Sequence, residues 1–192
     1  MKTSMECLNV RTGTSLFPMK WLCLGLFILL SGCCGVPEGL QPVTGFKIDQ
    51  YLGRWHEIVR LDHSFERGLT NVTADYSKLP DGRVEVINRG FNPVKNAWQD
   101  AKGVARFQGS PDIGSLEVSF FGPFYGAYNV LVLDSKYRYA MVAGPNRSYL
   151  WILARESQLD KATLDMLVTR AKDWGFATDK LIYVDQKLHS QK

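Results

Sequence analysis

The chain has 192 residues, of which 45% are hydrophobic and 22% charged, a composition typical of one globular domain rather than of a disordered chain. The formal net charge is only +4, and the basic residues beyond position 33 are scattered singly. Nucleic-acid binding needs a basic patch or stripe. We therefore expect no nucleic-acid partner.

The first 34 residues contain all four cysteines, so the rest of the chain can form no disulfide framework, cysteine-based zinc site or thiol nucleophile. In this region Lys20 precedes the apolar run Trp21–Leu30. Spanning a bilayer takes about 20 apolar residues, so the run is too short for a membrane span and fits the core of a signal peptide. We predict a signal peptide over residues 1–32.

The tetrapeptide LSGC, which ends at Cys33, resembles a bacterial lipobox. The resemblance implies cleavage before Cys33 and a lipid on its sulfur. Cys34 at the next position implies anchoring in the outer membrane of a Gram-negative cell, with the protein facing the periplasm. The alternative is a plain secretory signal followed by a cysteine by chance. Residues 33–46 are rich in proline and glycine without periodicity, which predicts a lipidated N-terminus on a flexible tether.

The next part of the chain has a hydrophobic period of two, which is typical of half-buried strands. Turn signals such as Pro80-Asp81-Gly82 separate the apolar runs. Eight strands at a spacing of roughly ten to twelve residues predict an antiparallel sandwich or barrel. The strand-like runs cover residues 54–61, 72–79, 83–91, 100–108, 114–121, 127–134, 137–144 and 148–156.

After residue 156 the period changes to that of a helix. Ser157 with Asp160 resembles a capping box, and Gly175 is a fitting stop. We predict one helix over residues 158–174, packed on the outside of the strands, and a short ninth strand in the run KLIYVD. The apolar stripe of the predicted helix consists of Leu164, Leu167, Val168, Ala171 and Trp174.

The predicted strands carry three short motifs: a Gly-x-Trp motif on the first strand, the turn LDSKYRY after the sixth, and an arginine that ends the eighth. Together these motifs resemble those of the lipocalin family. The Cys-free barrel and the lipobox are most similar to the bacterial outer-membrane lipoprotein branch. The motif residues are Gly53, Trp55, Asp134, Tyr137 and Arg155.

This resemblance implies an all-β fold over residues 47–186: an eight-stranded antiparallel up-and-down barrel, one C-terminal helix packed outside, and a short ninth strand. Residues 187–192 would be a polar tail. In such a barrel Trp55, Asp134 and Arg155 meet at one end. We expect Arg155 to stack on the indole, bond to nearby carbonyls and close that end, which is a structural role.

A barrel of this size has room for one ligand. Strand alternation starting from an inward Trp55 predicts an apolar and aromatic lining that suits a hydrophobic small molecule such as a fatty acid or lysophospholipid. The alternative is that these aromatic side chains fill a core. The predicted ligand-binding residues are Glu57, Val59, Phe65, Ala74, Tyr76, Val86, Asn88, Tyr125, Val130, Met141, Tyr149 and Trp151.

The same alternation places four loops at the open end, opposite Trp55. Aromatic and basic side chains in these loops suit a membrane surface, but they suit a homodimer contact equally well. The sequence leaves both possibilities open. The loops are residues 61–70, 90–97, 121–127 and 144–148.

No catalytic residue, metal site or cofactor is predicted. His56, His63 and His189 lack the spacing of metal ligands, and no nucleophile elbow or phosphate-binding glycine loop is visible. Glu57 inside a barrel needs a ligand hydroxyl or an arginine as its partner. We expect a lipid-binding lipoprotein for storage, transport or repair of membrane lipids. The rivals are a barrel enzyme acting on a lipophilic substrate and an envelope assembly protein with a closed barrel.

Overall fold

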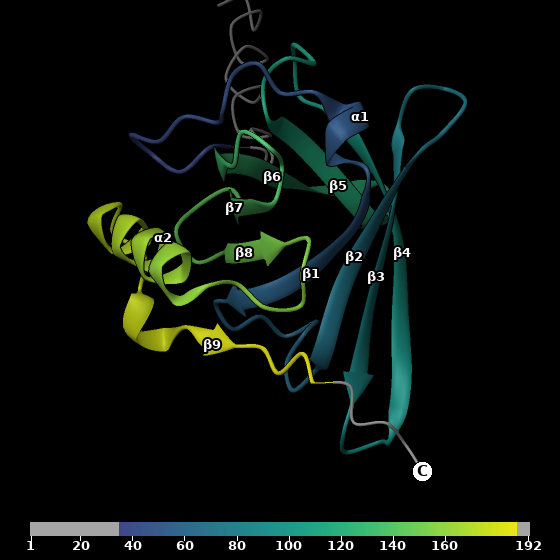
Figure 1. Ribbon diagram of the computed structural model, residues 1–192. Helices are drawn as coiled ribbons and strands as arrows, with labels where there is room; N and C mark the ends of the chain where they lie inside the picture. The colour runs from purple at the N-terminus through teal and green to yellow at the C-terminus, as the bar shows by residue number, and fades with distance from the viewer. Residues whose placement is uncertain (1–34, 188–192) are drawn as a thin grey trace, which may run out of the picture. The chain divides into compact units, whose positions relative to one another are not determined.

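Residues 35–187 are described by the computed structural model shown in Figure 1. The predicted signal peptide, the predicted lipidation site Cys33 and most of the polar tail lie outside these residues. The strands are β1 (Gly53–Arg60), β2 (Thr70–Lys78), β3 (Val84–Asn92), β4 (Ala97–Phe107), β5 (Ser115–Phe121), β6 (Phe124–Leu133), β7 (Tyr139–Ala143), β8 (Leu150–Ala154) and β9 (Ile182–Tyr183).

The strands form one antiparallel sheet in which each of β2 to β7 pairs with the next strand along the chain. Strand β1 pairs with β8 on one side and with β2 on the other, so the sheet closes into a barrel. The short β9 is added along β1. The predicted eight-stranded up-and-down barrel with a ninth strand is confirmed.

β-Bulges in β1 and β6 interrupt the regular alternation of side chains. In β1, Glu57 pairs with Leu153 while Val59 pairs with Ile152, so Ile58 is an extra residue. In β6, Val130 pairs with Val142 while Val132 pairs with Met141. An extra residue reverses which face the following side chains occupy. Alternation counted from Trp55 or from the closed end is therefore wrong beyond each bulge.

Helix α2 (Lys161–Asp173) packs on the outer faces of β6, β7, β8 and β1 through its buried Leu167 and Ala171 (Figure 1). It begins three residues later than predicted because Asp160, rather than Ser157, accepts the N-terminal hydrogen bond from the backbone of Thr163. Gly175 has a φ of +80° and ends the helix as predicted.

Two short helical elements flank the barrel. Helix α1 (Ile48–Tyr51) precedes β1 and places Tyr51 in the barrel core. The 3₁₀ helix η1 (Thr178–Lys180) links α2 to β9. No helix within residues 35–187 is long and apolar enough to cross a bilayer.

Residues 35–46, predicted as part of a flexible tether, are instead bound to the barrel. The amide of Val43 donates to the carbonyl of Val130 at 2.9 Å, and the amide of Phe46 donates to Asp112 at 2.8 Å. Phe46 is buried against the core. Proline and glycine give this segment no periodicity, but its backbone groups still find partners on β6 and in the loop between β4 and β5.

Candidate ligand-binding cavity

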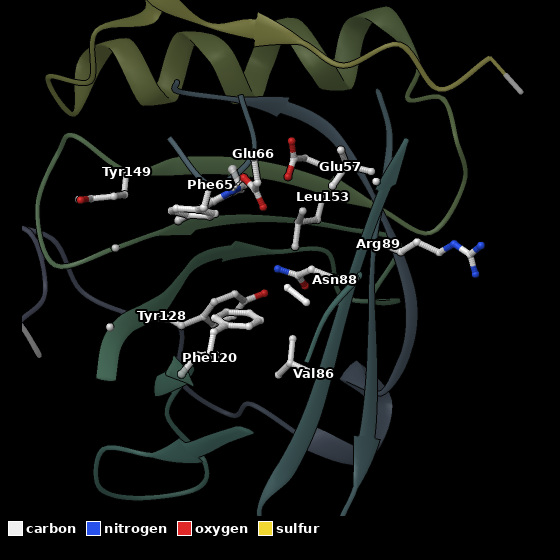
Figure 2. A pocket seen from close by; sticks show the side chains of 18 of the residues that line it. Glu57, Phe65, Glu66, Val86, Asn88, Arg89, Phe120, Tyr128, Tyr149 and Leu153 are labelled. Carbon is white, nitrogen blue, oxygen red and sulfur yellow. Dashed lines mark hydrogen bonds between the residues drawn. The ribbon is translucent and has the colours of Figure 1, made fainter. Parts of the chain in front are cut away.

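The barrel encloses a cavity of about 650 Å³ that opens at one end (Figure 2). This volume lies in the range of roughly 300–1,000 Å³ typical of small-molecule sites. Apolar side chains such as Val86, Phe120 and Leu153 make up most of its lining. A barrel packed shut, as the assembly-protein alternative required, does not match this interior.

A guanidinium stacked on an indole ring closes the other end of the barrel. The guanidinium of Arg155 lies 4.0 Å from the centre of the Trp55 ring. It donates hydrogen bonds to the carbonyls of Arg54 and Gln50, both at 2.8 Å, and to that of Tyr137 at 3.2 Å. A stacked guanidinium with three carbonyl acceptors ties β1, α1 and the β6–β7 turn together.

The β6–β7 turn is held by Asp134. Its carboxylate accepts hydrogen bonds from the backbone amides of Lys136 and Arg138 and from the Arg138 guanidinium. These donors, led by the Arg138 side chain, hold the pKa of Asp134 down at about 2. Tyr137, with a φ of +56°, occupies the centre of this turn. The motif residues thus build the closed end and do not line the cavity.

Three tyrosine hydroxyl groups form the floor between the closed end and the cavity. The hydroxyl of Tyr128 is hydrogen-bonded to those of Tyr51, at 2.7 Å, and Tyr76, at 2.9 Å. Burial raises the pKa of all three. Tyr76 and Tyr128 also line the cavity. The floor is therefore a neutral hydrogen-bonding surface at neutral pH.

One wall of the cavity carries two carboxyl groups. Glu57 and Glu66 both line it, and in Figure 2 they lie close to each other. Arg60 Nη1 donates to Glu57 Oε1 at 2.6 Å, and its Nη2 donates to the carbonyl of Glu66 at 2.8 Å. Trp151 donates its indole N–H to Glu66 Oε2 at 3.1 Å. Arg60 faces this side because the bulge at Ile58 turns it inward.

Burial sets the protonation of this wall. Burial, and then the carboxyl group of Glu66, raise the pKa of Glu57 to about 8, which outweighs the lowering by Arg60. Burial likewise raises the pKa of Glu66. Burial, followed by the charge of Arg60, lowers the pKa of His63 to about 4, so its imidazole is neutral. Two carboxyl groups beside one guanidinium thus retain a proton at neutral pH.

Most of the predicted ligand-binding residues surround this cavity; that they bind a ligand stays a prediction. Those in the lining are Glu57, Phe65, Ala74, Tyr76, Val86, Asn88, Tyr125, Tyr149 and Trp151.

Three predicted residues do not line it. Val59 and Met141 lie on the outer face, in the cluster under helix α2, because each faces the other way once the bulges are counted. Val130 faces inward but belongs to the packed core near the closed end. Strand alternation counted without the bulges placed Val59 and Met141 on the wrong face, whereas the inward direction predicted for Val130 is correct.

Several lining residues were missed by the sequence reasoning. Tyr128 lies two residues before Val130 on the same strand face, so alternation could have found it. Glu66 lies in the loop between β1 and β2, where no periodicity applies. Arg89 borders the cavity, but its side chain points away in Figure 2 and stacks over Trp98 at 4.7 Å.

Among residues 35–187, three side chains near the site have buried polar atoms without a hydrogen-bond partner. They are Asn88, whose Oδ1 is unpaired and which lines the cavity, Arg60 at its Nε, and His63 at both ring nitrogens. His63 instead packs between the rings of Phe65 and Trp151. Within residues 35–187, no three His, Cys, Asp or Glu side chains gather in a way that could hold a metal ion.

A barrel that is closed at one end and open at the other around an apolar cavity defines a class of small-molecule binding proteins. Residues 46–186 match the family described as "Lipocalin-like domain". The chain belongs to the lipocalin family.

Several known proteins are similar to this chain. It is 49% identical over 161 residues to the outer membrane lipoprotein Blc of Vibrio cholerae, a match that covers 83% of this chain and 94% of that protein. It is 50% identical to the Escherichia coli protein of the same name, and this match covers 78% of this chain and 85% of that protein. Temperature-induced lipocalin-1 of Arabidopsis thaliana is 31% identical to this chain, and the match covers 74% of this chain and 80% of that protein.

Solved structures also share the fold. The cockroach allergen Per a 4 and insecticyanin from the tobacco hornworm Manduca sexta each superpose with a TM-score of 0.63 and 21% identity. The matches cover 80% of this chain and 96% and 88% of those chains. At this identity they show the fold alone.

Proposed function

We propose that this protein is a lipid-anchored lipocalin of the outer membrane that holds a fatty acid or lysophospholipid-like molecule for storage, transport or repair of membrane lipids. The observation that carries the proposal is the open, mainly apolar cavity of about 650 Å³. A hydrocarbon chain inside it leaves water for an apolar lining, which favours binding by about 0.8 kcal/mol per buried CH₂ group.

The polar groups of the lining suit the other end of such a ligand. Asn88 Oδ1 has no hydrogen-bond partner among the described residues and can accept a hydrogen bond from a ligand hydroxyl or amide. Protonated Glu57 can donate one to a ligand oxygen. An unpaired buried carbonyl oxygen is costly, so a ligand that satisfies Asn88 gains affinity.

The proposed location rests on two observations. The LSGC tetrapeptide at Cys33 resembles a lipobox, and the bacterial relatives at 49% and 50% identity are named outer membrane lipoproteins. We place the protein on the periplasmic side of the outer membrane, held by lipid on Cys33.

Ligand binding without catalysis explains the arrangement of the cavity best. Glu57, whose pKa burial raises to about 8, is engaged by Arg60 at 2.6 Å. The described lining places no nucleophile next to a general base, as an enzyme acting on a lipophilic substrate would need.

The test uses the Cys33→Ala chain, which cannot be acylated, after removal of bound lipid. Isothermal titration with palmitate and with lysophosphatidylcholine should show saturable binding of one ligand per barrel. Ala101 lines the cavity, so Ala101→Trp should fill part of it and weaken binding. Lys102→Trp is the matched control, because Lys102 is the next residue along β4 and its side chain is 69% exposed on the face away from the cavity.

Absence of saturable binding by both lipids would overturn the proposal. Equal weakening by Ala101→Trp and Lys102→Trp would remove the cavity as the site. Membrane retention of the Cys33→Ala chain in cells would contradict the anchor.

A further inference from the structure

The first described residue lies beside the open end of the barrel. The Asn129 side chain donates hydrogen bonds to the carbonyl of Gly35 at 3.0 Å and to that of Gly144 at 3.2 Å. A Cβ placed on Gly35 would lie 3.7 Å from the carbonyl oxygen of Pro145. Gly144 and Pro145 line the cavity in the β7–β8 loop. Gly35 is therefore attached next to the mouth of the cavity.

A second contact fixes the same region. Arg147, in the β7–β8 loop, donates from Nη2 to the carbonyl of Glu38 at 2.7 Å and from Nε to that of Trp174 at 2.6 Å. This side chain holds the N-terminal segment against the loop and the end of helix α2. The chain then continues through Val43 to Phe46 in the core near the closed end.

The proposed lipid attachment site is close to this point. Cys33 precedes Gly35 by two residues, and two residues of extended chain reach at most about 7 Å. A lipid on Cys33 therefore enters the bilayer next to the β7–β8 loop. The closed end lies at the other end of β7, beyond the reach of so short a link.

The mouth also carries exposed apolar side chains. Seven large apolar side chains are exposed within residues 35–187, and four of them lie at the mouth. Phe121 and Phe124, on either side of the β5–β6 turn, are 81% and 78% exposed, and Val94 on the β3–β4 turn is 94% exposed. Phe65 on the β1–β2 loop is 60% exposed. Aromatic side chains at this density favour insertion into a bilayer surface.

We infer that the mouth of the cavity docks on the phospholipid bilayer that holds the anchor, with Phe65, Val94, Phe121 and Phe124 in the lipid and Cys33 acylated beside them. The inference rests on the acylation of Cys33 in the proposed function. Lipid would pass directly between the bilayer and the cavity. The short link to Gly35 sets this orientation, which a flexible tether would leave undefined.

The inferred contact between the mouth of the cavity and the bilayer is mainly apolar. Arg67 at the mouth is paired with Asp62 at 2.6 Å, and Arg147 is occupied by backbone carbonyls. Lys95, next to Val94, adds an exposed positive charge on the β3–β4 turn. We therefore expect docking on both zwitterionic and anionic lipid, with only a weak dependence on salt.

Spin labels on the acylated full chain test the orientation in vesicles of phosphatidylethanolamine and phosphatidylglycerol. Cys34→Ser removes the neighbouring thiol, and a single label is placed by Phe124→Cys or Lys95→Cys at the mouth. Ser135→Cys, exposed in the β6–β7 turn at the closed end, is the matched control. Power saturation then compares access of lipid-soluble oxygen with access of a water-soluble nickel chelate. Mass spectrometry first verifies the lipid on Cys33.

The expected result is loss of nickel access with gain of oxygen access at positions 124 and 95, and free nickel access at position 135. An acylated chain whose mouth labels stay in water would overturn the orientation and leave the anchor standing. Loss of access to both reagents at position 124, increasing with protein density, would assign the mouth to a second copy of the chain. Cys33 without lipid would overturn both the anchor and the orientation.

Discussion

Glu57 and Glu66 are unusual residues of the cavity wall, because their carboxyl groups are buried. They lie beside one guanidinium, that of Arg60, and burial raises the pKa of both. The pKa of Glu57 is about 8, against an ordinary value of 4.5. Because the folded state holds this proton more tightly than the unfolded chain, the stabilising effect is complete below about pH 4.5 and is lost as the pH rises toward 8.

Glu57→Gln should therefore become more stable relative to the parent chain as the pH rises through this range. One linked proton changes the folding equilibrium up to about tenfold per pH unit. Urea unfolding of both delipidated chains between about pH 5 and pH 9 measures the difference. Glu85→Gln is the control, since the hydrogen bond from Lys102 lowers the pKa of Glu85 below this range. Parallel profiles for Glu57→Gln and the parent would contradict the raised pKa.

Helix α2 covers the outer face of four strands. Leu167 is completely buried in the cluster between this helix and the barrel, whereas its neighbour Met166 is 38% exposed. We expect Leu167→Ala to lower the free energy of unfolding by about 2–5 kcal/mol. Met166→Ala should change it by less than about 0.5 kcal/mol. Urea denaturation gives both values, and equal losses would mean that the helix is not anchored through Leu167.

The whole molecule should gain stability when its cavity is filled. A ligand that binds only the folded barrel stabilises it by about 2.7 kcal/mol at one hundred times its dissociation constant. For a domain of this size that corresponds to a rise in Tm of roughly 5–11 °C. Differential scanning calorimetry with lysophosphatidylcholine and the delipidated Cys33→Ala chain measures it. The rise should be smaller for Ala101→Trp at the same lipid concentration, and an equal rise would place the lipid elsewhere.

Residue patterns predicted much of the interior correctly where the strands are regular. Alternation placed Ala74, Tyr76, Val86 and Asn88 in the lining, because β2 and β3 pair without a bulge along that stretch. The motif residues correctly predicted the stacking of Arg155 on Trp55. Loops were harder, since Glu66 has no periodic signal and its position depends on contacts with Arg60 and Trp151.

The barrel, the outer helix and the closed end could be predicted from the amino-acid sequence, because strand and helix periods and the motif positions are local properties of the chain. The direction of Val59 and Met141 toward the helix and the contact between Arg60 and Glu57 follow from the folded barrel instead, because a bulge appears only when strands pair. The tertiary structure also decided where Gly35 leaves the barrel. That position depends on hydrogen bonds to residues about a hundred positions away along the chain, which no local pattern records.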